Sequence, residues 1–238
     1  MRYFIVCTIF ISFIMGCASN QKIGRSDNKN QKKFVDGFRK KLGEYDVLAR
    51  ESAVRFSDSR LDELLDDGHA LSQVTASCIQ EDFSKGFDIL DENYLKYKKH
   101  PAYWNQMGSC YFHKGELDKA VLYYNKSREI NPRYAPPLNN LGVIYQNKGL
   151  DQKALVAFKK TLKLDSKALT PSFNLAQLYL KYGMIKRALA IYSKLYKAND
   201  ADNDVINGMA NCYLMQGKIN NALRFFAKID YDVIKRPT

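Results

Sequence analysis

Cysteine and histidine are the side chains in this sequence that could hold a metal or act as nucleophiles, and their spacing supports neither role. His69, His100 and His113 lie far from one another along the chain. The chain has no Cys-x-x-Cys pair, paired-histidine zinc motif, glycine-rich phosphate loop or nucleophile elbow. Its five cysteines are an odd number, which excludes a disulfide framework that pairs all of them. We therefore expect a protein that is not an enzyme and that uses no metal and no cofactor.

One cysteine, Cys17, has a context that indicates covalent modification. After Met1-Arg2 an almost unbroken apolar run continues to Met15. With about 13 residues it is too short for a bilayer core, which needs roughly 20, but long enough for an export signal. The run ends at Ile14-Met15-Gly16-Cys17, which resembles a bacterial lipoprotein cleavage box. The alternatives are an ordinary signal with an incidental cysteine, or an uncleaved anchor.

The lipoprotein resemblance implies a signal peptide over residues 1–16 and acyl chains such as palmitate on Cys17. Several acyl chains anchor a protein stably, where one chain binds only marginally. Ala18, directly after the cysteine, implies the periplasmic face of the outer membrane. We therefore expect a chain that is lipid-anchored in the bacterial cell envelope.

Two segments connect this predicted anchor to the rest of the chain. Residues 17–33 are mostly polar and carry more basic than acidic side chains, which predicts a flexible tether. In residues 34–66 apolar side chains recur at spacings of three and four, as expected for an amphipathic helix: Phe34, Phe38, Leu42, Tyr45 and Leu48. This helix either lies on the membrane surface or packs onto the first repeat, and its mixed charges favour packing.

An internal repeat with a period of about 34 residues, a length typical of stacked repeat architectures, dominates the remainder of the chain. Five columns of similar residues recur at this period: Gly108, Gly142, Ala176 and Ala210; Tyr111, Tyr145, Tyr179 and Tyr213; Gly115, Gly149, Gly183 and Gly217; Ala120, Ala154, Ala188 and Ala222; Tyr124, Phe158, Tyr192 and Phe226. The Gly115 column would end the first helix of each unit, because glycine adopts left-handed backbone angles without strain. We expect the small Gly108 column to face the Ala120 column across each hairpin.

This pattern resembles the tetratricopeptide repeat (TPR). The fullest match lies in residues 101–134, which contain Trp104, Gly108, Tyr111, Gly115, Ala120, Tyr124 and Pro132. The resemblance implies an all-α fold, a TPR helical-hairpin solenoid that winds as a right-handed superhelix. We divide it into a degenerate repeat over 67–100 and repeats over 101–134, 135–168, 169–202 and 203–236.

The repeat register also bears on the cysteines. Cys110 and Cys212 occupy the same slot of units three repeats apart, too far for a disulfide. Cys78 and Cys110 lie in neighbouring units, where a disulfide is geometrically conceivable. We nevertheless expect three buried free thiols, at Cys78, Cys110 and Cys212.

In TPR stacks the first helix of each unit lines a concave groove, and the resemblance implies which slots contact a partner. These slots hold Asn105, Gln106, Ser109, His113, Asn139, Asn140, Asn147, Phe173, Asn174, Gln177, Lys181, Asn207 and Asn211. An amide both donates and accepts, so a row of amides could pair with the backbone of an extended peptide. The alternative is that these asparagines are generic TPR surface. On the groove hypothesis, replacing Asn140 and Asn174 by alanine weakens partner capture and leaves the thermal midpoint nearly unchanged.

These features predict a membrane-anchored TPR adaptor that binds a protein partner, either an extended peptide or a secretin-like subunit. The plan resembles TPR lipoproteins that assist assembly of a type IV pilus secretin. Alternatives are an outer-membrane protein assembly subunit or a regulator of a cell-wall synthesis enzyme. The net charge of +12 suggests nucleic-acid binding as another class of function. Export would separate the chain from nucleic acid, so we expect no nucleic-acid partner.

Overall fold

The computed structural model describes residues 70–229, which contain eleven α-helices and no β-strand. The helices are α4 (Ala70–Ile79), α5 (Phe83–Glu92), α6 (Tyr94–Tyr97), α7 (Pro101–His113), α8 (Leu117–Ile130), α9 (Pro136–Asn147), α10 (Asp151–Leu164), α11 (Leu169–Lys181), α12 (Ile185–Ala198), α13 (Asn203–Met215) and α14 (Ile219–Phe226). The prediction of an all-α hairpin solenoid is confirmed for this part of the chain. The predicted signal peptide (1–16), tether (17–33) and N-terminal helix (34–66) lie outside the described residues.

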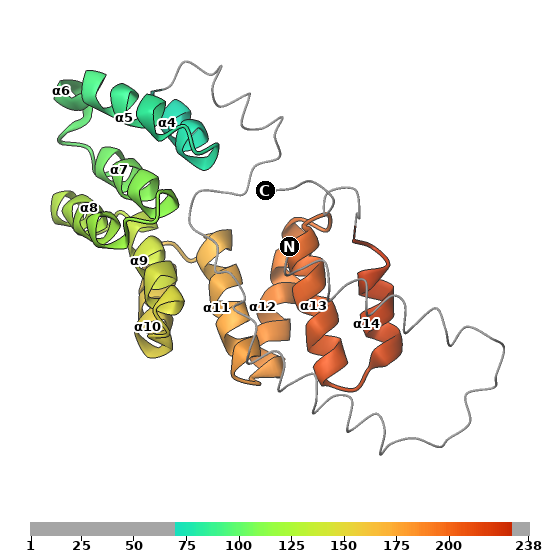
Figure 1. The fold of residues 1–238 in the computed structure, drawn as a ribbon. Coiled ribbons are helices and arrows are strands. Elements are labelled where there is room, and N and C mark those ends of the chain that lie inside the picture. Colours follow the sequence, from blue (N-terminus) through green and yellow to red (C-terminus); the bar gives the residue numbers. More distant parts are fainter. Residues whose placement is uncertain (1–69, 230–238) are drawn as a thin grey trace, which may run out of the picture.

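The helices form antiparallel hairpins that follow one another along the stack in chain order (Figure 1). In each hairpin the first helix (α4, α7, α9, α11 or α13) packs against the second (α5, α8, α10, α12 or α14). From α8 onward, each second helix also contacts the first helix of the next hairpin. First helices also contact one another, α4 with α7, α7 with α9 and α11 with α13. None of the helices between residues 70 and 229 is long and apolar enough to cross a membrane.

Each first helix ends at a left-handed residue, as the glycine column predicts. Gly115, Gly149, Gly183 and Gly217 have φ of 84°, 71°, 69° and 75°. The next residue closes the turn, as where the Glu116 N–H donates to the Tyr111 carbonyl at 2.9 Å. In the first hairpin Glu81 takes the same slot with a φ of 64°. The hairpin turn is therefore retained even where the glycine is not.

The small-residue column has a different neighbour from the one the sequence predicts. A Cβ atom placed on Gly108 would lie 2.6 Å from the Tyr124 ring, and one on Gly142 would lie 2.6 Å from the Phe158 ring. The nearest neighbours of these glycines are therefore aromatic rings of the second helix rather than the alanine column that the sequence predicts. Tyr124 and Phe158 are fully buried, and their rings occupy the space that the missing side chains of Gly108 and Gly142 leave. A large ring on the second helix therefore requires a small residue opposite it on the first helix, because packed interiors leave no spare volume.

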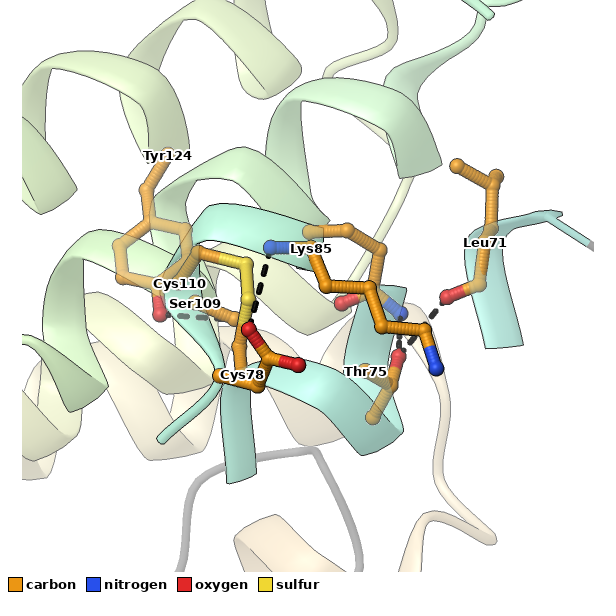
Figure 2. Close-up of a disulfide and its surroundings, with 9 residues drawn as sticks. Leu71, Thr75, Cys78, Lys85, Ser109, Cys110 and Tyr124 are labelled. Atoms are coloured by element: carbon orange, nitrogen blue, oxygen red, sulfur yellow. Dashed lines mark hydrogen bonds between the residues drawn. A yellow bond between two sulfur atoms is a disulfide. The ribbon is translucent and has the colours of Figure 1, made fainter. Parts of the chain in front are cut away.

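The cysteines also differ from the expectation of three free thiols. Cys78 of α4 and Cys110 of α7 form a disulfide, with Cα atoms 5.1 Å apart (Figure 2). Direct packing of α4 on α7 brings the two positions within bridging distance. Gly86 lies opposite, and a Cβ there would collide with the Cys78 sulfur. Within residues 70–229 only Cys212 remains a free thiol, and it is buried.

Candidate partner-binding surface

The first helices form one side of the stack, and this side carries almost no charge. Helices α4, α7, α9, α11 and α13 contain only two residues of the Asp, Glu, Lys and Arg types, Lys181 and Asp204. Amide and apolar side chains make up most of the remainder. We call the side of these helices that points away from the second helices the inner face. Its chemistry is that of neutral hydrogen-bonding groups.

A chain of hydrogen-bonded asparagines links three of the first helices. Asn174 of α11 donates to the Asn139 Oδ1 of α9 at 3.0 Å. Asn139 donates to Asn140 at 3.2 Å, and Asn140 donates to the Asn105 Oδ1 of α7 at 3.3 Å. We call these four residues the amide ladder. Their exposed fractions range from 0% to 6%, so the ladder is an internal feature of the stack.

The ladder has a counterpart at the junction of α7 with α4. The Gln106 amide donates to the Thr75 hydroxyl at 2.6 Å, and this hydroxyl donates to the Leu71 carbonyl at 3.0 Å. Figure 2 shows Thr75 and Leu71 on one helix beside the disulfide. Amide contacts thus help to align α4, α7, α9 and α11.

The thirteen sequence-predicted groove residues divide into a buried set and an accessible set. The buried set is Asn105, Ser109, Asn139, Asn140, Phe173, Asn174 and Gln177. Ser109 lies 3.3 Å from the Tyr124 hydroxyl, and the Phe173 ring packs against Tyr192. In this conformation these residues present little surface to a partner, and their contacts align neighbouring helices instead. The accessible set is Gln106, His113, Asn147, Lys181, Asn207 and Asn211.

This burial changes what a mutation of the asparagines would do. Asn140 and Asn174 between them take part in all three hydrogen bonds of the ladder. Removing either takes a hydrogen bond away from a buried amide of the ladder, which costs stability. We therefore expect the double alanine variant to have a lower thermal midpoint, whereas the groove hypothesis left that midpoint nearly unchanged.

Near the accessible residue Lys181, a charged cluster joins two hairpins. The Lys181 ammonium lies 2.8 Å from the Asp151 Oδ2, and the Tyr182 hydroxyl donates to the same oxygen at 2.6 Å. Burial would raise the pKa of Asp151, but the hydrogen bonds from Lys181 and Tyr182 outweigh it and lower that pKa. The hydrogen bond that the Tyr182 hydroxyl donates to Asp151 raises the pKa of Tyr182. The other carboxylate oxygen, Asp151 Oδ1, is buried and has no hydrogen-bond partner within residues 70–229.

Exposed apolar side chains occur in the hairpin turns near this cluster, and the sequence predictions missed them. Tyr182 is 58% exposed, and Leu150 and Met184 are also exposed. In the neighbouring units Lys114 and Lys148 take the Tyr182 slot. A large apolar residue in a polar column is the signal that could have identified this patch.

These residues offer hydrogen-bonding and apolar contacts to a partner. No group of three or more His, Cys, Asp or Glu residues in the described segment could hold a metal ion. The inner face therefore has the chemistry of a binding surface.

Comparisons with known proteins agree with this architecture. Profiles described as tetratricopeptide repeat match residues 101–134 and 135–167. A search of curated proteins found no match.

Solved structures share the fold at low sequence identity. PilF from Pseudomonas aeruginosa aligns with a TM-score of 0.59 and 15% identity, over 71% of this chain and 76% of PilF. A tetratricopeptide repeat protein from Parabacteroides merdae aligns with a TM-score of 0.53 and 19% identity, over 88% of this chain and 79% of that protein. MamA aligns with a TM-score of 0.52 and 16% identity, over 65% of this chain and 91% of MamA.

These likenesses show a shared fold. The fold is typical of non-catalytic scaffolds that bind other proteins. The repeat profiles and the helical-hairpin stack together establish that this chain is a tetratricopeptide repeat protein, a scaffold for protein–protein interaction.

Proposed function

We propose that the protein is a membrane-anchored scaffold of the bacterial envelope that binds a protein partner along its inner face and assists assembly of an envelope complex. Acylated Cys17 holds the chain at the membrane, residues 17–33 act as the tether, and the TPR stack receives the partner. The partner is an extended peptide or a secretin-like subunit.

The observation that carries the envelope location is the disulfide between Cys78 and Cys110. Disulfides persist in oxidising compartments such as the periplasm and are rare in the bacterial cytosol. This bridge joins the first hairpin to the next one, so it belongs to the folded stack. It supports the export predicted from the N-terminal sequence.

The chemistry of the inner face supports the choice of partner. Its accessible side chains are mostly amides, together with His113 and the ion-paired Lys181. Neutral amides match the backbone of an uncharged segment better than an acidic or basic motif. We infer a partner segment that is low in charge and that places apolar side chains near Tyr182.

The complex that we favour is a type IV pilus secretin. This choice rests on the resemblance in plan, a predicted lipid anchor followed by a TPR stack, to lipoproteins that assist secretin assembly. An outer-membrane protein assembly complex and a cell-wall synthesis enzyme are the alternative partners.

Site-specific crosslinking in intact envelopes tests this function. A photo-crosslinking residue at Asn147 or Asn207 would sample the inner face, because both side chains are exposed there. The matched control carries the same residue at the exposed Lys159 of α10. We expect protein crosslinks from Asn147 and Asn207 but not from Lys159, and mass spectrometry identifies the partner. Absence of a protein crosslink at both inner positions would overturn the scaffold proposal.

A second experiment tests the anchor. Cells fed an alkyne fatty acid should label the wild-type protein, and the label should disappear in Cys17→Ala. Equal labelling of both proteins would refute acylation at this residue.

A further inference from the structure

The positive charge of the described chain is concentrated on the second helices. Helix α12 carries Lys186, Arg187, Lys194 and Lys197 and no acidic residue. Helix α10 carries four lysines and one acid, Asp151, which is buried against Lys181. The first helices carry almost no charge, as described above. The two sides of the stack therefore differ sharply in electrostatic character.

The repeat register arranges these cations in rows. Lys126, Lys160, Lys194 and Lys228 recur at the repeat period, and all four are exposed. Lys163 and Lys197 form a second pair at the same spacing, each three residues beyond a member of the first row. Residues three apart lie on one face of a helix. Successive hairpins repeat that face, so the cations form a basic surface across neighbouring second helices.

Four of these cations take part in none of the ion pairs of the stack. Lys160, Lys163, Lys194 and Lys197, which we call the lysine quartet, form no ion pair within residues 70–229. At the ends of the row Lys126 pairs with Glu129, and Lys228 donates to the Tyr196 hydroxyl. The quartet on α10 and α12 thus offers uncompensated charge to solvent.

Aliphatic side chains project from the same surface. Leu122 is 61% exposed and Val156 is 51% exposed, and the two residues occupy the same slot of successive repeats. Each precedes a lysine of the row by four residues, Lys126 and Lys160, so each shares its face. Leu164, four residues after Lys160, is exposed as well.

Lysines interspersed with exposed aliphatic residues suit the lipid–water interface better than a nucleic acid. At an anionic bilayer the ammonium groups meet head groups, while the aliphatic residues enter the acyl boundary. A nucleic-acid surface would instead combine cations with aromatic stacking or base-edge donors, and isolated aliphatic side chains add little there.

We infer that the exposed faces of α8, α10 and α12 form a membrane-docking surface for anionic phospholipid head groups, which lays the second helices on the bilayer and leaves the inner face open to a partner. The inference rests on the membrane location proposed above but not on acylation of Cys17. A tether alone would let the stack tumble, whereas this contact orients it.

Vesicle binding by the full chain tests the inference. All proteins carry Cys17→Ala, so that no acyl chain contributes. One set of vesicles contains only neutral phosphatidylcholine, the other contains phosphatidylcholine and phosphatidylglycerol in a two-to-one ratio, and the readout is the ratio of the two partition coefficients. The quartet variant carries Lys160→Gln, Lys163→Gln, Lys194→Gln and Lys197→Gln. Its ratio should fall about tenfold or more, because each lysine near an anionic surface contributes on the order of 1 kcal/mol.

The matched control removes the same charge elsewhere, as Lys85→Gln, Lys96→Gln, Lys99→Gln and Lys218→Gln. All four are exposed and lie off the outer faces of α8, α10 and α12. This variant should bind nearly as the parent does, because the lysine quartet is unchanged. Circular dichroism and thermal melting of both variants establish that they fold. Equal losses in the quartet and control variants would overturn the inference, since total charge alone would then explain the binding.

A third variant distinguishes a bilayer from a soluble polyanion. Leu122→Gln with Val156→Gln should weaken binding to anionic vesicles and leave binding to double-stranded DNA unchanged. Quartet-dependent binding to DNA without quartet-dependent binding to vesicles would overturn the membrane assignment. Because these assays use purified components, their failure would leave the crosslinking test of the proposed function unaffected.

Discussion

At the scale of the residue, the hairpin turns show how one slot tolerates two solutions. Gly115, Gly149, Gly183 and Gly217 adopt positive φ without cost, whereas Glu81 adopts 64° with a Cβ in place. A non-glycine residue in this region costs roughly 1 kcal/mol or more. The first hairpin therefore folds with strain that the others lack.

This strain predicts the effect of Glu81→Gly. The substitution should raise the free energy of unfolding by about 1 kcal/mol, because it relieves the backbone without removing a contact of the exposed side chain. Chemical denaturation of the oxidised protein measures the change. Gly115→Ala is the reciprocal control and should destabilise by a similar amount, because alanine at a positive φ strains the backbone. Nothing lies within 4 Å of an added Cβ there, so no steric clash adds to this cost. A destabilising Glu81→Gly would contradict the strain argument.

The cysteines give a second prediction at this scale. Burial raises the pKa of the Cys212 thiol to about 12, so this thiol stays protonated and shielded at neutral pH. In the native, unreduced protein an alkylating reagent should modify neither Cys78, Cys110 nor Cys212. After unfolding without reductant only Cys212 of these three should react. Peptide mapping by mass spectrometry reads this result, and alkylation of Cys78 in unreduced, unfolded protein would refute the disulfide.

At the scale of the element, the amide ladder determines how first helices align. Asn140→Ala with Asn174→Ala removes all three hydrogen bonds of the ladder, because Asn140 also accepts from Asn139. The expected loss is about 2–4 kcal/mol, from roughly 1 kcal/mol for each buried bond that is removed. Thermal or chemical unfolding measures it. Asn147→Ala with Asn207→Ala, at exposed positions, should change stability by less than about 0.5 kcal/mol, and equal losses in the two variants would contradict a structural ladder.

The Asp151 cluster predicts how the junction of α10 and α11 responds to acid. Hydrogen bonds lower the folded-state pKa of Asp151. The stability that Asp151 contributes is therefore fully present above the ordinary aspartate pKa of about 3.9, and it is lost as the pH falls from there through the lowered folded-state pKa. Tyr182→Phe removes one of these hydrogen bonds. The free energy of unfolding between pH 6 and pH 3 should therefore fall less steeply in this variant than in the wild type. Identical pH profiles would show that the Tyr182 hydrogen bond does not contribute to the pKa shift of Asp151.

At the scale of the whole molecule, the stack separates its two surfaces by helix type. The first helices carry amides and almost no charge, and the second helices carry exposed lysines. An antiparallel hairpin presents one helix on each side, so the repeat places a neutral surface and a basic surface back to back. One surface can therefore bind a partner while the other meets a membrane.

This arrangement predicts that the two activities are separable. The lysine-quartet variant should keep its protein crosslinks from Asn147, since the quartet lies on the opposite helices. A variant with Asn147→Ala and Asn207→Ala should keep the vesicle binding of its parent. Envelope crosslinking and vesicle sedimentation on both variants provide the measurement. Loss of both activities in either variant, with folding intact, would show that the two surfaces are coupled.

Features that depend on local backbone chemistry could be predicted from the sequence. Glycines at a constant period fix where first helices end, and the small and aromatic columns mark the buried positions, so an all-α hairpin stack follows from the residues alone. Once the period is known, the sequence also shows that charged residues lie mostly on the second helix of a hairpin and rarely on the first.

Only the tertiary structure decided which side chains meet between hairpins. The pairing of Cys78 with Cys110, the ring that fills the space above Gly108, and the burial of Asn140 and Asn174 all depend on how closely adjacent helices approach. The repeat period states that slots recur, but not the distance or angle at which successive units pack. That geometry arises from the collective fit of side chains across the interface, and it turned a predicted partner-binding row into an internal ladder.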